Sequence, residues 1–92
     1  MIALTDQSTP RLAAKVRLKW DEVRQKPLLL YPEGVLVLNP AAHEILGLCD
    51  GRRTIADIVQ TLVEKYHSDK IGADVNELLT KLMAKGFVAV AD

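Results

Sequence analysis

The side chains best suited to chemistry in this chain are two histidines and one cysteine: His43, His67 and Cys49. Imidazole and thiolate groups are common zinc ligands, and structural zinc sites hold them at close, regular spacing. The two histidines fall in different predicted helices, and no cysteine or carboxylate stands at the spacing that a zinc site needs. We therefore predict no metal site, and we interpret His43 as a solvated residue early in a helix.

Cys49 and the Asp50-Gly51 pair that follows it are the other candidates for chemistry. A lone cysteine on the apolar face of a helix usually behaves as a small buried hydrophobe rather than as a nucleophile. Asp50 and Gly51 are explained by the end of that helix, where glycine readily takes the left-handed conformation. Glycine-rich phosphate loops, nucleophile elbows and paired acids are absent from the sequence. We predict a protein that is not an enzyme and that needs no cofactor.

Length and composition indicate one small globular domain, with 92 residues of which 49% are hydrophobic. Residues 1–30 hold six Lys/Arg against three Asp/Glu, an excess far too small for binding nucleic acid through its phosphates. The sequence shows no membrane span and no secretion signal, and one cysteine agrees with a reducing compartment, so we expect a cytoplasmic protein without a membrane partner. Residues 1–10 lack periodicity and are predicted to be a flexible tail, and residues 11–92 to form the domain.

The first half of the chain predicts three antiparallel strands. Apolar residues alternate with basic ones from Val16 to Trp20, which is typical of a half-buried strand with Trp20 toward the core. Residues 28–39 then read as a hairpin of two apolar strands, joined by a three-residue turn in which Gly34 takes a left-handed conformation. The second strand of this hairpin, residues 35–38, shows no alternation of apolar and polar residues. Either both of its faces are covered, or one face awaits a partner.

The second half predicts three helices. Asn39-Pro40 is a typical start for the first helix, which ends at Asp50-Gly51. Thr54 and Asp57 have the spacing of a capping box and open the second helix, whose apolar residues recur with helical periodicity. A loop over residues 68–72 precedes the third helix, which we expect to run from Asp74 to Gly86. Residues 87–90 are either a short final strand or an apolar tail packed on the core.

The predicted fold is therefore α+β: a small winged-helix-like domain, with a three-stranded antiparallel sheet followed by three helices. Winged-helix proteins often bind DNA, so a DNA-binding regulator is the alternative function. The third helix offers only Lys81 and Lys85 to phosphates, and Arg52-Arg53 is explained by a solvated turn. Basic residues thus form no stripe on the second or the third helix, which are the two candidate recognition helices.

Recognition of a peptide by strand addition remains, in which an extended segment pairs with a sheet edge beside an apolar groove. The strand at residues 35–38 suits this role, with the third helix as the wall of the groove. The same strand could equally be buried between its own sheet and the helices. The apolar pattern leaves both interpretations open.

Several short motifs resemble the PqqD family of pyrroloquinoline quinone biosynthesis over about residues 11–90. The residues that carry the resemblance are Arg17-Leu18-Lys19-Trp20-Asp21, Leu29-Leu30-Tyr31-Pro32-Glu33-Gly34, Leu38-Asn39, Ala42, Ile45-Leu46, Cys49-Asp50-Gly51 and Thr54. The resemblance implies a non-catalytic chaperone that binds the ribosomal precursor peptide PqqA. It further implies that the chaperone presents PqqA to PqqE, a radical S-adenosylmethionine enzyme, as leader-peptide recognition elements do in related pathways.

In that family the peptide adds beside the third strand and lies against the third helix. Carried over by position, the resemblance implies these peptide-binding residues: Val35, Leu36, Val37 and Leu38 on the strand, and Val75, Leu78, Leu79, Leu82 and Lys85 on the helix. An apolar edge of this kind can also meet its own copy, so we expect a monomer when dilute and a strand-exchanged homodimer at high concentration.

Overall fold

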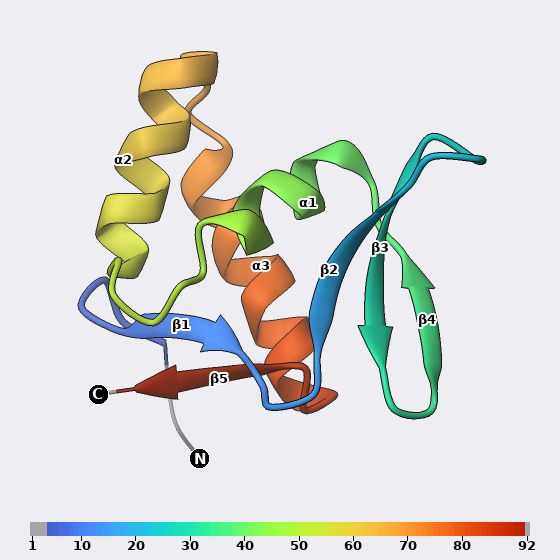
Figure 1. Ribbon diagram of the computed structural model, residues 1–92. Helices are drawn as coiled ribbons and strands as arrows, with labels where there is room; N and C mark the ends of the chain where they lie inside the picture. The colour runs from blue at the N-terminus through green and yellow to red at the C-terminus, as the bar shows by residue number, and fades with distance from the viewer. Residues whose placement is uncertain (1–3, 92) are drawn as a thin grey trace.

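The computed structural model describes residues 4–91, in two small sheets and three helices (Figure 1). The elements follow in the order β1 (Thr9–Leu12), β2 (Arg17–Asp21), β3 (Lys26–Tyr31), β4 (Gly34–Val37), α1 (Pro40–Gly47), α2 (Ile55–Tyr66), α3 (Ile71–Ala84) and β5 (Val88–Ala91). The antiparallel sheet β2-β3-β4 stands beside the helices, and a second antiparallel pair, β1-β5, crosses beneath them (Figure 1). The predicted α+β fold is confirmed.

The β1-β5 pair changes the boundary of the predicted N-terminal tail. Thr9 and Pro10 belong to β1, where Pro10 is opposite Val90, and the side chain of Ser8 is buried. The backbone N–H of Ile55 also donates to the carbonyl of Ser8 at 2.9 Å, which ties this segment to the start of α2. Residues 8–10 are thus part of the folded domain, while residues 1–3 of the predicted tail lie outside the described residues. Of the two alternatives for residues 87–90, the structure shows the short strand, β5.

Two details of the three-stranded sheet differ from the prediction. The hairpin turn has two residues rather than three, since Tyr31 pairs with Gly34, and Gly34 has no positive φ. Trp20 keeps 45% of its surface exposed and lies beside the ring of His43, with 6.1 Å between the ring centroids. Trp20 and Leu18 point to the same face of β2, as predicted, but β2 extends past the edge of the core at Trp20.

The starts of α1 and α2 follow from capping. The Asn39 side chain accepts the N–H of Ala42 at 2.7 Å, and Thr54 and Asp57 form the predicted capping box. Two boundaries were predicted wrongly. α1 ends at Gly47, before Gly51, whose φ of 79° belongs to the turn that follows. α3 begins at Ile71 rather than Asp74. Its N-cap residue is Lys70, which makes no side-chain capping bond, so no capping residue marks this start in the sequence.

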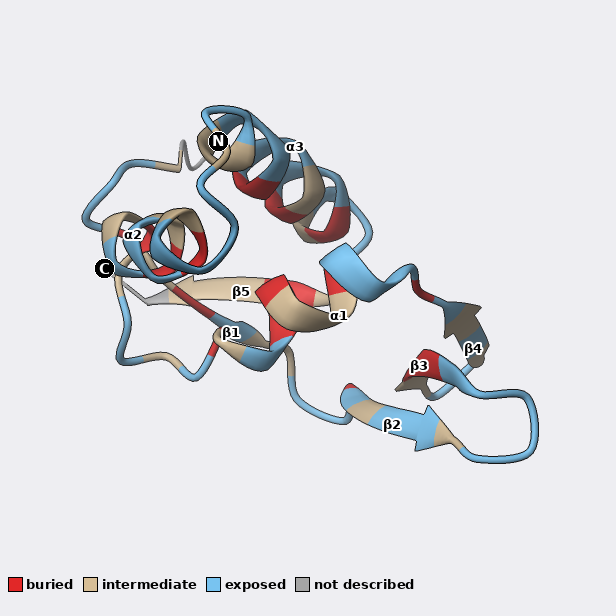
Figure 2. Ribbon diagram, turned by 90° about the horizontal axis from the view of Figure 1, so that it is seen from above, coloured by how far each residue is buried: buried red, intermediate tan, exposed pale blue. Residues whose placement is uncertain are grey.

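The core lies where the three helices meet the inner face of the sheet and β5 (Figure 2). Each helix contributes one buried stripe, as the apolar spacing predicted. The largest fully buried apolar side chains of the core are Leu29, Leu46, Ile55, Ile58, Val75 and Leu79. None of the helices in the described part of the chain is long and apolar enough to cross a membrane.

Candidate functional site

The free edge of β4 is the first feature of the candidate site. In the order β2-β3-β4, β4 is paired on one side only within the described residues. Leu38 donates its backbone N–H to the carbonyl of Pro27 in β3, at 2.9 Å. Along an antiparallel strand, residues that bond to the neighbouring strand alternate with residues that do not. Leu36 therefore bonds toward β3, whereas the backbone N–H and C=O groups of Val35 and Val37 point to the open edge. This arrangement can accept another strand.

The side chains of β4 alternate with equal clarity. Val35 and Val37 are 54% and 52% exposed, on the sheet face that turns away from the helices. Leu36 is half-buried and packs on the core, and Leu38 is buried. Of the two interpretations left open by the sequence, the structure excludes the one in which both faces of this strand are covered.

The residues predicted on α3 divide into two groups. Val75, Leu79 and Leu82 are buried in the core, so they support the helix from behind. Leu78 is half-buried and lines a groove, and Lys85 is exposed at the C-cap of the helix. Of the five residues predicted to bind the peptide from α3, only Leu78 and Lys85 are therefore accessible.

The groove beside Leu78 lies between α3 and the start of α1 and has a volume of about 340 Å³. It begins at Asn39, two residues after the end of β4. Its lining consists of Asn39, Ala41, Ala42, Ile45, Asp74, Glu77, Leu78 and Lys81. Sequence reasoning missed Ala41, Ala42 and Glu77 as lining residues and treated Asp74 only as the start of the third helix. The charge order on α3, acidic in its first half and basic in its second, is a sequence signal for Asp74 and Glu77.

Glu44 is the most strongly bound carboxylate near this groove. The Tyr66 hydroxyl donates to it, and Lys65 Nζ lies 3.1 Å from its Oε1. The hydrogen bond from Tyr66, followed by the contact with Lys65, lowers the pKa of Glu44 below its ordinary value, while partial desolvation opposes this. Glu44 is therefore ionised at neutral pH.

The candidates for catalysis have structural roles. Cys49 is buried and its Sγ donates to the carbonyl of Ile45 at 3.3 Å, and burial raises the pKa of the thiol to about 12. Asp50 accepts the backbone N–H groups of Arg53 and Arg52, which lower the pKa of its carboxyl. Among residues 4–91, no three His, Cys, Asp or Glu side chains are grouped so that they could hold a metal ion. The arrangement is suited to binding through backbone and apolar contacts.

Comparison with known proteins gives one consistent result. Residues 28–88 match the family described as "Coenzyme PQQ synthesis protein D (PqqD)". The "PqqA binding protein" of Rhodopseudomonas palustris strain HaA2 is 46% identical, over 98% of this chain and 90% of that protein. The "Bifunctional coenzyme PQQ synthesis protein C/D" of Methylorubrum extorquens is 41% identical, over 90% of this chain and 23% of that protein.

A solved structure agrees with these relatives. The solution NMR structure of the PqqD truncation of Methylobacterium extorquens PqqCD has a TM-score of 0.81 and 39% sequence identity to this chain. The match covers 95% of each chain. That truncation is described as a functional, stand-alone recognition element for ribosomally synthesised and post-translationally modified peptides.

Proposed function

We propose, from the membership of this chain in the PqqD family, that it is a non-catalytic chaperone that binds the precursor peptide PqqA during pyrroloquinoline quinone biosynthesis. Its role is to present PqqA to the radical S-adenosylmethionine enzyme PqqE. Near full-length similarity to proteins named for PqqA binding, and to a peptide recognition element, supports the binding role. The DNA-binding alternative has no such support, and the first half of α3 carries the carboxylates of Asp74 and Glu77, which repel phosphate.

The proposed binding mode is strand addition to β4. The observation that carries it is the open edge of β4, where the backbone groups of Val35 and Val37 pair with no other strand among residues 4–91. A peptide paired there places alternate side chains on the inner face, beside Leu36 and toward α3. Leu78 and Lys85 of α3 then supply the accessible contacts, with the buried residues Val75, Leu79 and Leu82 holding the helix in place.

Two proline variants of β4 test this mode. Val37→Pro removes an N–H from the open edge and leaves the bonds to β3 intact, so the fold survives and affinity for synthetic PqqA falls at least tenfold. Leu36→Pro removes an N–H from the β3-β4 ladder and damages the sheet itself. Calorimetry gives the affinity, and circular dichroism with thermal unfolding reports the fold.

Val37→Thr is the matched control, because it keeps the N–H and the β-branched shape. We expect it to bind PqqA within a few-fold of the original chain. Full-strength binding by a folded Val37→Pro variant would contradict strand addition at this edge. Failure of the unmodified chain to bind PqqA at all would contradict the peptide-binding role.

Presentation to PqqE has its own test. PqqE should modify PqqA faster when this chain is added, and Val37→Pro should remove most of that increase. A rate that does not depend on the chain, in an assay where PqqA is shown to be bound, would contradict presentation while leaving peptide binding in place.

A further inference from the structure

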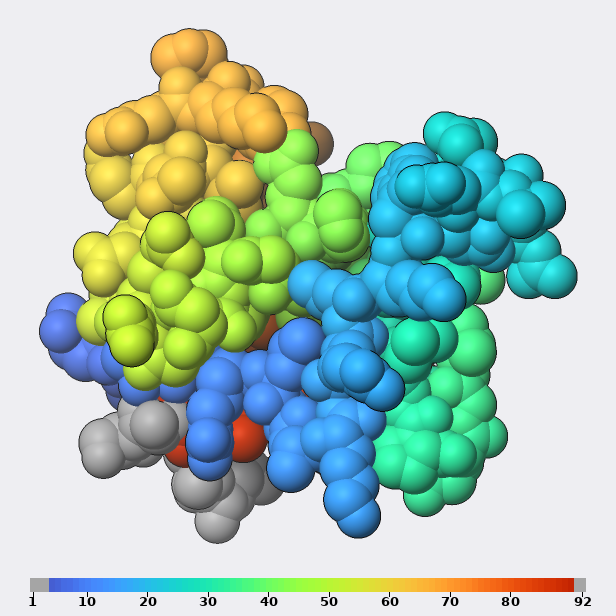
Figure 3. All heavy atoms as spheres, in the orientation of Figure 1, coloured from blue at the N-terminus to red at the C-terminus, as the bar shows by residue number. Residues whose placement is uncertain are grey.

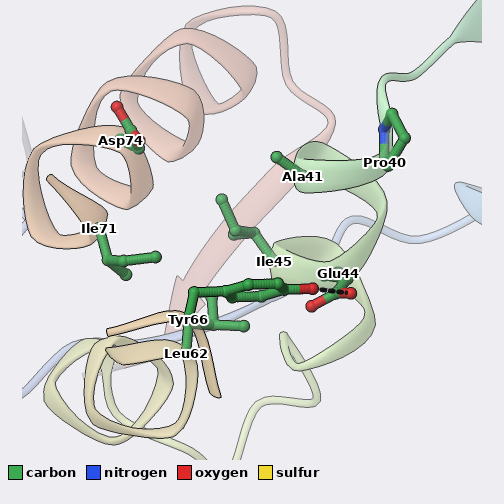
Figure 4. Close-up of a pocket in the computed structure, with 8 residues that line it drawn as sticks. All are labelled: Pro40, Ala41, Glu44, Ile45, Leu62, Tyr66, Ile71 and Asp74. Atoms are coloured by element: carbon green, nitrogen blue, oxygen red, sulfur yellow. Dashed lines mark hydrogen bonds between the residues drawn. The ribbon is translucent and has the colours of Figure 1, made fainter. Parts of the chain in front are cut away.

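A second cavity lies where the three helices converge, outside the peptide-binding residues predicted above. Its volume is about 290 Å³. Ile45, Leu62 and Ile71 supply apolar walls, and the ring of Tyr66 extends across to Glu44 (Figure 4). Small-molecule sites usually span roughly 300–1,000 Å³, so this cavity is at the lower end of that range and has room for one large side chain.

This cavity adjoins the groove between α1 and α3. Ala41, Ile45 and Asp74 line both hollows. The groove starts at Asn39, directly after Leu38, so the two hollows form one path from the end of β4 to the C-terminal turn of α2. We call this path the α1–α3 trough. In the space-filling view, α1 lies between the sheet and α2 (Figure 3).

Most charged side chains that line the trough are negative. Glu44, Asp74 and Glu77 line it with carboxylates, and Lys81 is the one basic residue in its lining. Lys65 forms an ion pair with Glu44, but no ion pair involves Asp74 or Glu77 within residues 4–91. An apolar cavity with two unpaired carboxylates beside it favours an apolar side chain next to a basic one.

We propose that the α1–α3 trough is an extension of the peptide site, filled by the part of the peptide that leaves β4 at Leu38. This part places one apolar side chain in the 290 Å³ cavity and a neighbouring Lys or Arg beside Asp74 and Glu77. The inference rests on the proposed function, since it assumes that the peptide adds to β4. It gives the site a charge requirement that strand addition alone lacks.

Two substitutions test the trough, each with a matched control. Ala41→Leu narrows the path at an exposed helix position that lines both hollows, and Ala73→Leu makes the same change on an exposed part of α3 that lines neither. Asp74→Asn removes a carboxylate from the trough, and Asp69→Asn removes one from the nearby loop. We expect Ala41→Leu to weaken binding of full-length PqqA roughly tenfold and Asp74→Asn severalfold, with both controls unchanged.

A peptide series gives the sharper measurement. Each apolar residue of PqqA is replaced in turn by alanine, and the affinity of each peptide is measured for the original chain and for Ala41→Leu. One alanine replacement should weaken the binding of the peptide to the original chain but should not weaken its binding to Ala41→Leu any further. Two changes that remove the same contact behave in this way. Circular dichroism and thermal unfolding confirm that the variants fold.

Wild-type affinity of folded Ala41→Leu and Asp74→Asn for PqqA would overturn the trough proposal, and would leave strand addition standing if Val37→Pro still loses binding. Equal losses from the control substitutions would also overturn it, because the effect would then be general. Absence of PqqA binding by the original chain would overturn the proposed function and the extension together.

Discussion

The hydroxyl of Tyr66, in the last turn of α2, donates a hydrogen bond to the carboxylate of Glu44 on α1. The two residues are 22 positions apart, and their bond closes one side of the cavity between the helices (Figure 4). It also raises the pKa of the tyrosine while it lowers the pKa of the glutamate, because the ionised carboxylate favours the protonated phenol.

This bond predicts a pH-dependent difference between Tyr66→Phe and the original chain. Because the pKa of Glu44 is lowered on folding, ionised Glu44 stabilises the fold above about pH 4.5, and that stability is lost as the pH falls through the lowered pKa. Tyr66→Phe should therefore be less stable at neutral pH, and the difference should shrink toward pH 3. Urea unfolding at several pH values measures it; a constant difference across this range would contradict the assignment to Glu44.

The thiol of Cys49 should be unreactive in the folded chain. A pKa of about 12, against an ordinary 9.0, leaves about a thousandfold fewer thiolates at pH 8. Alkylation by iodoacetamide should therefore follow unfolding, with fast labelling in urea and slow labelling without it. Rapid labelling of the folded chain would show that Cys49 is accessible, contrary to its burial.

The capping box of α2 should contribute measurably to stability. Thr54 Oγ1 accepts the N–H of Asp57, and Asp57 Oδ2 accepts the N–H of Thr54, both at 3.1 Å. Thr54→Ala should lower the free energy of unfolding by about 1 kcal/mol. Thr80→Ala, at an exposed position inside α3, is the control and should cause no loss, since alanine favours helix. Equal losses in the two variants would contradict a specific capping effect.

Two glycines should respond in opposite directions to alanine. A methyl group at Gly47 or at Gly86 meets no atom within 4 Å, so backbone conformation alone separates them. Gly47 is in α1, and Gly47→Ala should raise the free energy of unfolding by about 0.5–1 kcal/mol. Gly86 has a φ of 81°, and Gly86→Ala should lower it by about 1–2 kcal/mol. Thermal or urea unfolding checks both signs, and a shared sign would contradict this explanation.

Self-association through β4 should compete with the peptide. We expect a monomer when dilute and a dimer at high concentration that uses the same open edge, with the turn between Tyr31 and Gly34 as the hinge for strand exchange. Sedimentation over a concentration series, with and without PqqA, measures this. A dimer population that the peptide does not change would place the self-contact, or the peptide, away from β4.

Local patterns in the sequence determined most of the secondary structure. Asn39-Pro40 and the Thr54-Asp57 pair set two helix starts, because a cap acts on backbone groups within three residues of it. The apolar spacing of α2 and α3 identified the buried stripes, and the apolar run after Gly34 predicted the strand that is β4. Membership of the PqqD family was also visible in short motifs.

Only the tertiary structure decided the features that depend on distant partners. Thr9 and Pro10 form a strand because β5 lies beside them, about 80 residues later in the chain, a contact that no local pattern encodes. Trp20 is half exposed because the sheet extends past the core, and Val75, Leu79 and Leu82 face inward while Leu78 lines the groove. The α1–α3 trough combines residues from three helices, so its shape and charge arise only when those helices pack together.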